Sequence, residues 1–569
     1  MRKDRRHLIR ITVTGILFLL LLSGNALAAK KQILTASCPS VCAEKVTAYQ
    51  GKNGMVLFLP GFWDLSRIVL ELEGTETLQI GRNAVAIPAG TETDLSGLVG
   101  LAGTGQELRN GSGKSLGILT ILQGSRIPSL FLEVDGEELG KVRRSKDNVI
   151  TEGRAVCRGA DGTAEYDGAL EQLKGRGNNS FRYAKKPYQI KLGEKAPLCG
   201  MGRGKTWVLL ANWTDVSLLR NQIVLDMSRE IGLRNAVGCV QADVWINGIY
   251  NGLYTLTEKI QIGSGRIDIT NLEKATEKVN PVPFSPGTIF TEKSAERPLI
   301  RSYPGVADPE DITGGYILTV EKKHRMRDKV LAGFRTKDEL SIRIKEPTYP
   351  SEKQAAYVFN LVSETQRALM AEDGINPETG KAYDEYLDVI SFAQRFLIED
   401  WTKNYDFTGG SQFMYKDSDL ADPLIYAGPS WDYDLCFGNM NDRGYSPQGK
   451  YLTAYRRNLN LYWLLYNHEP FRKQVVRIWQ EVFRPAVSVL LGEADAEPDG
   501  IVRSLEEYRE RISASAAMNY RRWPVSQDAS GRGSGGNFDT AAAYLKKWIT
   551  ERTAWMDAEY IPETSADGT

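Results

Sequence analysis

The spacing of apolar residues separates the chain into a strand-rich first part and a mixed second part. Between residues 30 and 150, short apolar runs such as residues 54–60 recur at intervals of roughly 8 to 14 residues, with glycine-rich turns between them. Little of this region has the period of an amphipathic helix. The pattern predicts a small β-sandwich of the immunoglobulin-like kind over residues 30–150, a module that commonly serves as a spacer or docking domain.

From about residue 166 onward, strands and helices are mixed, and helices dominate towards the end. Apolar runs predict strands at residues 188–192, 206–212, 241–248, 250–260, 314–321 and 340–347. A helical period predicts helices at residues 217–232, 351–372, 384–403, 470–492, 501–522 and 539–558. We therefore expect an α+β protein in which a strand-rich lobe precedes a helix-rich lobe.

The first 28 residues have the composition of an export signal. A basic stretch up to Arg10 precedes an apolar run, and Ala26 and Ala28 form a small-residue cleavage site. We expect a signal peptide over residues 1–28 and a secreted or cell-surface protein. An uncleaved membrane anchor is the alternative, although the apolar run is shorter than the roughly 20 residues that span a bilayer. No later segment is apolar enough for a transmembrane helix.

Charge and histidine content narrow the possible chemistry. The 71 basic and 71 acidic side chains cancel, so the overall charge gives no reason to expect a nucleic-acid partner. The three histidines are His7, His324 and His468, which disfavours zinc chemistry and histidine-based nucleophilic triads. Carboxylates and lysines remain as catalysts, and a bound metal would be a hard cation such as Mg²⁺ or Mn²⁺.

Six cysteines follow the predicted signal peptide. An exported chain permits disulfides, and Cys38 and Cys42 are the closest pair along the sequence. Six cysteines in a chain of this length do not form a disulfide scaffold, so we expect most of them to be free buried thiols. The six are Cys38, Cys42, Cys157, Cys199, Cys239 and Cys436.

A glycine turn followed by a lysine-bearing strand is the first candidate for phosphate chemistry. Arg176 and Gly177 lie in a Gly-Arg-Gly-Asn turn, and Lys191 follows in the strand predicted next. Backbone N–H groups in such a turn can approach a phosphate, and a strand lysine can pair with the same anion. Protein kinases have a glycine-rich loop and a lysine in this order. Lys185 and Lys186 compete for the role, and a plain turn with a solvated lysine is the alternative.

The loop after the helix predicted at residues 384–403 carries the second candidate. Asp406 lies in this loop, and Ser411 follows five positions later. In a kinase catalytic loop an aspartate positions the acceptor hydroxyl, and an asparagine five residues later binds metal. The alternative is that Asp406 only ends the helix.

A pair of aspartates forms the third candidate. In an extended segment, alternating side chains point to opposite faces, so Asp432 and Asp434 would lie on one face. Two carboxylates bracketed by apolar residues are unfavourable unless a cation lies between them. Mg²⁺ or Mn²⁺ would satisfy this need, and a pair of turn-stabilising or arginine-paired aspartates is the alternative.

These residues resemble the CotH kinase family, the atypical secreted kinase-like proteins related to the spore coat protein CotH. The resemblance covers roughly residues 150–490 and rests on residues 176–178, 184–192, 207–221, 246–259, 314–318, 404–417 and 428–439. It implies an atypical protein-kinase-like fold that binds ATP and a divalent metal. It also implies phosphorylation of serine or threonine in secreted or surface proteins.

The resemblance implies roles for individual residues. Asp406 resembles the catalytic-loop aspartate, and Lys191, or Lys186 in its place, resembles the phosphate-pairing lysine. The cofactor-binding residues it implies are Gly177, Lys186, Lys191, Glu258 and Trp431. The metal ligands it implies are Asp432, Asp434, Ser411 and Asn439.

Several of these assignments have alternatives. Ser411 departs from the family pattern because a hydroxyl is a weaker metal ligand than a carboxamide, and Gln412 or Asn439 could substitute. Glu258 lies where a hinge would follow a strand, or it is an ordinary strand-end acid. Trp431 either stacks on adenine or packs in the core. The helix residues Arg220 and Asn221 also match the family and could be structural.

We expect a signal peptide over 1–28, a β-sandwich over 30–150, a CotH kinase-like domain over 151–500 and a C-terminal helical extension over 501–569. The expected function is an exported kinase that uses ATP and Mg²⁺ or Mn²⁺. One alternative is a catalytically inactive kinase-fold surface, coat or adhesion protein whose β domain docks to the cell envelope. Glycoside cleavage is disfavoured because neighbouring carboxylates on one strand would lie on one side of a sugar.

Overall fold

The computed structural model of this 569-residue chain describes residues 33–81, 85–99, 105–293, 299–328, 331–440, 446–453, 461–525 and 536–560. The predicted signal peptide over residues 1–28 lies outside this range. Within the described part of the chain, no helix combines the length and the apolar character that a membrane crossing needs.

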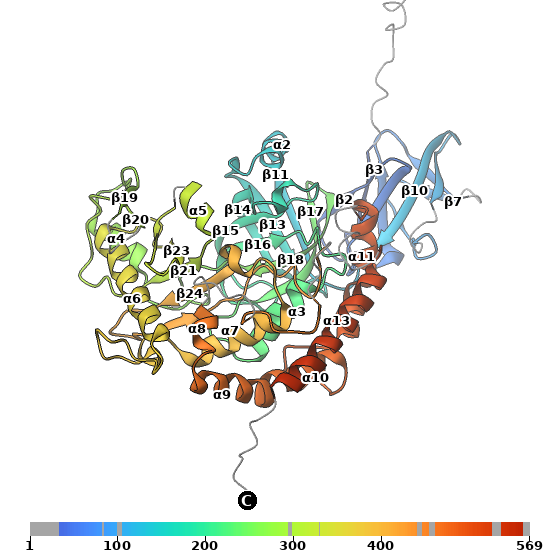
Figure 1. The fold of residues 1–569 in the computed structure, drawn as a ribbon. Helices are drawn as coiled ribbons and strands as arrows, with labels where there is room; N and C mark the ends of the chain where they lie inside the picture. The colour runs from blue at the N-terminus through green and yellow to red at the C-terminus, as the bar shows by residue number, and fades with distance from the viewer. Residues whose placement is uncertain are drawn as a thin grey trace, which may run out of the picture.

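A closed ring of strands lies near the centre of the molecule (Figure 1). Eleven strands of the 12-stranded sheet have the order β16-β15-β14-β13-β11-β17-β18-β2-β1-β5-β8, and β12 pairs with β14 beside them. An additional pairing of β16 with β18 closes the first seven strands of this order into a barrel. Apolar side chains such as Ile190, Trp207 and Tyr254 fill the barrel interior. The barrel strands are β11 (Ser129–Val134), β13 (Gly153–Arg158), β14 (Ala164–Gly175), β15 (Tyr188–Ala196), β16 (Gly204–Leu210), β17 (Cys239–Ile246) and β18 (Ile249–Glu258).

The region predicted as a separate β-sandwich contains two facing sheets, but it does not end at residue 150. A six-stranded sheet, in the order β3-β4-β10-β9-β6-β7, shares one core with β1 and β5. However, β1, β2, β5 and β8 belong to the barrel sheet, and β11 pairs with β13 and β17. The predicted boundary is wrong because strand pairing depends on partners distant in sequence, which local periodicity does not report.

The strands of this region are short. Those that extend the barrel sheet are β1 (Leu34–Ser37), β2 (Lys45–Thr47), β5 (Ile68–Leu72), β8 (Glu92–Thr93) and β12 (Val149–Ile150), the last of which pairs with β14. Those of the six-stranded sheet are β3 (Tyr49–Gly51), β4 (Gly54–Leu59), β6 (Thr77–Ile80), β7 (Val85–Pro88), β9 (Gln106–Asn110) and β10 (Ser115–Gln123).

A third sheet of seven strands is covered by helices on one face (Figure 1). Its inward side chains, such as Leu318 and Ile342, pack with Val358 of α6 (Glu352–Met370) and Phe396 of α7 (Val389–Thr402). In sheet order, its strands are β19 (Phe290–Glu292), β20 (Leu299–Ser302), β22 (Gly333–Arg335), β23 (Ser341–Glu346), β21 (Tyr316–Val320), β24 (Gln412–Lys416) and β25 (Ile425–Ala427).

The remaining helices surround the barrel and the third sheet. The helix predicted over 470–492 is two helices, α9 and α10, joined by a π-helical turn at Trp479–Phe483. The helices are α2 (Gly136–Arg144), α3 (Arg220–Glu230), α4 (Leu272–Val279), α5 (Lys323–Asp328), α8 (Leu461–Leu465), α9 (Glu469–Ile478), α10 (Arg484–Leu491), α11 (Leu505–Arg522) and α13 (Phe538–Glu559).

The last two helices belong to the main body. α11 packs against β18 and β10, and α13 packs against α7, α10 and α11. Arg552 of α13 forms a buried ion pair of 2.7 Å with Asp400 of α7. The prediction of a C-terminal extension beginning at residue 501 is therefore corrected, because these helices complete the same hydrophobic core.

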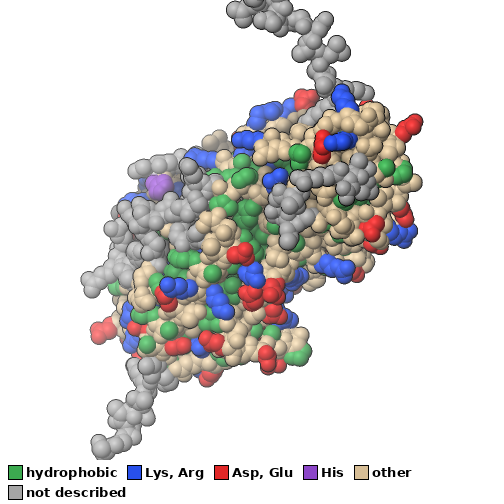
Figure 2. All heavy atoms as spheres, turned by 90° about the vertical axis from the view of Figure 1, so that its right-hand side faces the viewer, with side chains coloured by type: hydrophobic (Ala, Val, Ile, Leu, Met, Phe, Trp, Pro, Cys, Tyr) green, Lys and Arg blue, Asp and Glu red, His purple; other side chains and the backbone are tan. Residues whose placement is uncertain are grey.

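Acidic and basic side chains are interspersed on the molecular face shown in Figure 2.

The outer wall of the barrel meets the third sheet through a small apolar cluster. Val208 and Val237 come from the barrel side, Ile317 and Phe413 come from the third sheet, and Trp431 comes from the loop after β25. This contact brings the loop after α7 and the loop after β25 next to the barrel.

The mixed helix and sheet content agrees with the predicted α+β class, whereas the division into two kinase lobes stays a prediction.

Candidate active site

The loop that follows α7 presents Asp406. The helix ends at Lys403, whose backbone is left-handed with φ of 45° and whose N–H binds the carbonyl of Glu399 at 2.9 Å. The Asn404 side chain then accepts a hydrogen bond from the Asp406 N–H at 3.2 Å and donates one to the carbonyl of Asp432 at 3.1 Å. Asn404 therefore joins the loop of Asp406 to the loop of Asp432.

The loop after β25 presents Asp432 and Asp434, but not by strand alternation. The segment is irregular, and Asp432 has a left-handed backbone with φ of 72°, a conformation that is unfavourable for a residue with a β-carbon. The Tyr433 N–H donates to Asn221 at 2.9 Å, and the Tyr433 hydroxyl donates to Glu399 at 2.6 Å. Tertiary contacts around Tyr433 therefore orient the two carboxylates, and the predicted extended geometry is wrong.

The three aspartates influence one another electrostatically. Burial raises the pKa of Asp434 to about 7, and the Asp432 and Asp406 carboxylates add to this shift. Burial also raises the pKa of Asp432, which the Asp406 carboxylate raises further and Arg176 opposes. Burial is the main cause of both shifts and the neighbouring carboxylates add to it, so a bound cation would favour the ionised forms of Asp432 and Asp434.

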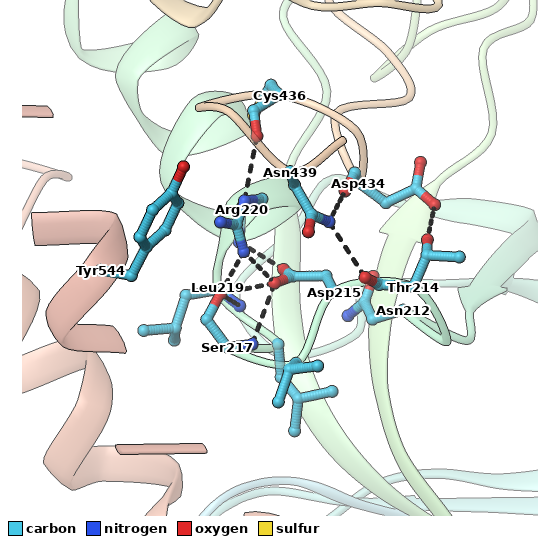
Figure 3. A network of polar contacts seen from close by, with 12 residues as sticks. Asn212, Thr214, Asp215, Ser217, Leu219, Arg220, Asp434, Cys436, Asn439 and Tyr544 are labelled. Carbon is cyan, nitrogen blue, oxygen red and sulfur yellow. Dashed lines mark hydrogen bonds and ion pairs between the residues drawn. The ribbon is translucent and has the colours of Figure 1, made fainter. Parts of the chain in front are cut away.

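Two hydroxyl groups contact the aspartates. Ser411 donates to Asp432 at 3.4 Å, so the structure does bring this predicted metal ligand to the aspartate pair. Thr214 donates to Asp434 at 2.5 Å (Figure 3). Thr214 was not predicted as a site residue, although it lies between Asn212 and Asp215 in a segment that the resemblance includes.

A buried network anchors the loop of Asp434 to the turn before α3 (Figure 3). Asn439 donates to the carbonyls of Thr214 and Asp434, at 3.0 and 2.6 Å. Arg220 forms a fully buried ion pair of 2.5 Å with Asp215 and donates to the carbonyl of Cys436 at 3.0 Å. Asn439 and Arg220 thus act here as positioning residues, and in this structure the Asn439 amide is directed to backbone carbonyls.

A second buried network links α7 to the same loop. Arg395 pairs with Glu399 at 2.9 Å and donates to the hydroxyls of Ser430 and Tyr433. It also donates to the carbonyl of Ser411 at 3.3 Å. Because Arg395 and Glu399 are both fully buried, removal of one would leave the other as an uncompensated charge.

The glycine turn brings Arg176 to the aspartates. β14 ends at Gly175, and Gly177 has φ of 85°, where a β-carbon would lie 2.1 Å from the Ser180 hydroxyl oxygen. The Arg176 guanidinium lies 5.2 Å from the ring centre of Trp431 and interacts electrostatically with Asp432. The predicted turn is therefore present, and Trp431 packs in the core with Arg176 over its ring.

Three further cations lie near Arg176, and none of them was predicted as a site residue. Lys345 and Arg343 are on β23, and Lys259 follows β18. Burial and the neighbouring Arg343 and Arg176 lower the pKa of Lys345 to about 8, and burial lowers the pKa of Lys259. The alternation along residues 341–346 was a usable signal, because Arg343 and Lys345 fall on the face opposite the buried Ile342 and Ile344.

The lysines predicted to pair with phosphate have other partners. Lys191 lies on the outer wall of the barrel, half exposed, in an ion pair of 2.8 Å with Glu171. Lys186 donates to the carbonyl of Phe181 at 2.7 Å. Lys185 is buried and donates to Asn519 of α11 at 2.8 Å. These three lysines therefore have structural contacts, and Arg176 takes the place next to Asp432.

Glu258 also has an ion pair and a hydrogen bond with neighbouring residues. Its carboxylate pairs with Arg266 at 2.5 Å and accepts a hydrogen bond from the Gly238 N–H at 2.8 Å. The chain from Glu258 to Ile260 nevertheless lines a pocket with Val237. The hinge-like position stays a prediction, but the side chain of Glu258 has a structural ion pair.

The donor atoms of the site suit a hard divalent cation. Asp432 and Asp434 offer carboxylate oxygens, Ser411 offers a hydroxyl, and oxygen donors are those that Mg²⁺ and Mn²⁺ prefer. The group of four cations, Arg176, Lys259, Arg343 and Lys345, suits a polyphosphate. The residues present therefore fit both a metal ion and a nucleotide.

Comparison with known proteins assigns the chain to a family. The profile of the CotH kinase protein family matches residues 173–556, a range that contains Arg176, Lys345, Asp406, Asp432 and Asp434. It also contains all of α11 and most of α13, in agreement with their place in the main body. No match was found among curated proteins. Because the match covers most of the chain, this protein belongs to the CotH kinase family.

Proposed function

We propose that the protein is an exported kinase that transfers the γ-phosphoryl group of ATP to serine or threonine side chains of secreted or cell-surface proteins, with Mg²⁺ or Mn²⁺ as cofactor. The convergence of Asp406, Asp432 and Asp434 beside Arg176 is the observation that carries this proposal. Phosphoryl transfer depends mainly on positioning and on charge neutralisation. Three carboxylates and a neighbouring cation meet those needs.

Each aspartate has a distinct role in the proposed reaction. Asp406 orients the acceptor hydroxyl and accepts its proton as the oxygen forms a bond to phosphorus. Asp432 and Asp434 would hold the metal ion, with Ser411 beside Asp432. A bound metal ion neutralises charge on the phosphate oxygens. Thr214 and Asn404 fix the orientation of the two loops, so that little rearrangement is needed when ligands bind.

Four cations and one pocket would hold the nucleotide. Arg176 and Lys345 would pair with phosphate oxygens, and Lys259 and Arg343 add positive charge around them. Burial lowers the pKa of all four side chains, and an anion would favour their charged forms. The pocket lined by Glu258, Lys259 and Ile260 is the proposed site for the base.

A second candidate function is a kinase-fold surface protein without catalytic activity. The observation that favours it is Ser411, which stands where a kinase catalytic loop has a metal-binding asparagine. In this case the N-terminal strands would dock to the cell envelope or to a coat. Export through the predicted signal peptide is common to both candidates.

One experiment separates the two candidates. The purified protein would be incubated with γ-labelled ATP, Mn²⁺ or Mg²⁺ and a serine-rich acceptor protein, and its melting temperature would be measured with and without ATP and metal. The kinase should label the acceptor and melt at a higher temperature with ligand, and Asp434→Asn should lose both effects. Equal labelling by wild type and Asp434→Asn, or no labelling by either, would refute the proposed activity.

A further inference from the structure

A second group of possible metal ligands lies away from the aspartates, at the β13–β14 hairpin. Within the described residues, Cys157, Glu165 and Cys199 each place one donor atom within 4.8 Å of the other two. Cys157 is on β13, Glu165 is on β14, and Cys199 is in the loop between β15 and β16. Three segments of the barrel wall therefore meet at this point.

The local backbone brings these side chains together. Cys157 is paired with Tyr166 and Arg158 with Ala164, so Glu165 is the extra residue of a β-bulge. A bulge redirects a side chain relative to the regular alternation. Cys199 has a left-handed backbone with φ of 54°, and its N–H donates to the Glu165 carboxylate. The bulge at Glu165 and the left-handed backbone of Cys199 thus place the three donor atoms close together.

The separation of the two sulfur atoms is that of two free thiols in contact, and it is compatible with a shared metal ion. The Sγ atoms of Cys157 and Cys199 are 3.8 Å apart. Two thiolates bound to one tetrahedral zinc ion, each at about 2.3 Å, lie about 3.8 Å from each other. A disulfide requires about 2.05 Å. The observed separation matches the metal-bound arrangement without further movement of the sulfurs.

We propose that Cys157, Cys199 and Glu165 bind a thiophilic divalent cation of the zinc class, with water as the fourth ligand. Binding releases one proton from each thiol to solvent. Cys157 is buried, Cys199 is partly exposed and Glu165 is exposed, so the ion can enter from the solvent side. The proposal does not depend on the proposed kinase activity.

The site would fix a loop that supports the Glu258 region. Residues 197–203 connect β15 to β16, and the carbonyl of Gly202 in this loop accepts a hydrogen bond of 3.0 Å from Arg266. Arg266 in turn pairs with Glu258. An ion held by Cys157 and Cys199 would therefore tie this loop to the β13–β14 hairpin and limit its movement.

The test is metal titration of the reduced, metal-free protein. Zn²⁺ would be added in competition with a chromogenic chelator, and Co²⁺ would serve as a spectroscopic probe because thiolate ligands give it an intense charge-transfer absorption. Wild type should bind one Zn²⁺ with this thiolate signature for Co²⁺. Cys199→Ser should abolish the signature, and Glu165→Gln should weaken Zn²⁺ binding about tenfold or more.

Control variants distinguish metal binding at this site from metal binding at the aspartates and from loss of the fold. Glu194→Gln, at an exposed position of β15, should bind Zn²⁺ as wild type does. Asp434→Asn should keep the thiolate signature. Absence of the signature from wild type would overturn the proposal. The proposal would also be overturned if the isolated protein had an intact mass two hydrogens below that of the reduced chain and peptide mapping located a Cys157–Cys199 disulfide. If the cysteine variants do not fold, Glu165→Gln still tests the proposal, because its substitution is at an exposed residue.

Discussion

Thr214 donates a hydrogen bond of 2.5 Å to Asp434, although the two residues are 220 positions apart. Thr214 follows the barrel strand β16, whereas Asp434 lies in the loop after β25 of the third sheet. A turn of the barrel therefore orients a carboxylate of the candidate metal site. The same turn is fixed by the buried pair of Asp215 and Arg220, so the geometry of the site depends on the packing of both sheets.

The first prediction distinguishes phosphoryl transfer from the binding of ATP and metal. Asp406→Asn should reduce phosphoryl transfer by about 10²- to 10⁴-fold, because the amide cannot accept the hydroxyl proton. It should retain the increase in melting temperature caused by ATP and Mn²⁺, since Asp432 and Asp434 remain. Transfer from γ-labelled ATP and a thermal melt measure the two quantities. The exposed Asp384 supplies the control variant Asp384→Asn, and normal transfer by Asp406→Asn would contradict the assigned role.

The second prediction distinguishes two lysines. Lys345→Met should lower kcat/KM for ATP by about 10²-fold, because it removes a partly buried positive charge from the group around Arg176. Lys191→Met should change kcat/KM little, since Lys191 pairs with Glu171 on the outer wall of the barrel. Steady-state kinetics with varied ATP tests both variants. A larger loss in Lys191→Met than in Lys345→Met would show that the lysine of the predicted strand is the phosphate ligand after all.

The third prediction concerns pH. The pKa of Lys345 is lowered to about 8, so the fraction of charged Lys345 falls as the pH rises through this value. We expect kcat/KM for ATP to decrease above about pH 8, because phosphate binding loses one positive charge. Lys345→Arg should remain charged and shift the decrease to higher pH. An identical alkaline decrease in wild type and Lys345→Arg would assign the effect to another group.

The fourth prediction concerns stability. Arg552→Met should lower the free energy of unfolding by about 3–5 kcal/mol, because Asp400 would be left as a buried charge without its partner. Chemical denaturation gives this value. The matched control is Arg477→Met, which removes an exposed pair with Glu481 and should cost less than about 1 kcal/mol. Equal, small effects of the two substitutions would mean that α13 contributes little to the core.

Local sequence patterns were informative where a single segment decides the structure. The glycine turn at Gly177 and the loop aspartate Asp406 were predicted from their immediate neighbours. Most of the helices lie close to their predicted limits. At the start of α6, for example, the Ser351 hydroxyl caps the Gln354 N–H, a contact that a few adjacent residues determine.

Features that require distant partners could not be predicted in this way. Lys191 is a strand residue as expected, but closure of the barrel places it on an outer wall beside Glu171. Lys345 is far from Arg176 along the chain, and only the packing of the third sheet on the barrel brings them together. The proximity of Cys157 to Cys199 depends on a bulge and a turn that periodicity does not show.

Residue identities and local patterns were enough to show which side chains could act as acids, bases and ligands, and in which turns and loops they lie. With few histidines available, these patterns pointed to the aspartates at 406, 432 and 434. The tertiary structure decided which cations face those aspartates, how the strands divide among sheets and that the last helices belong to the core. The physical reason is that side-chain identity and local backbone preference are properties of short segments. Burial, ion pairing and sheet order arise only when segments far apart in the chain exclude water together.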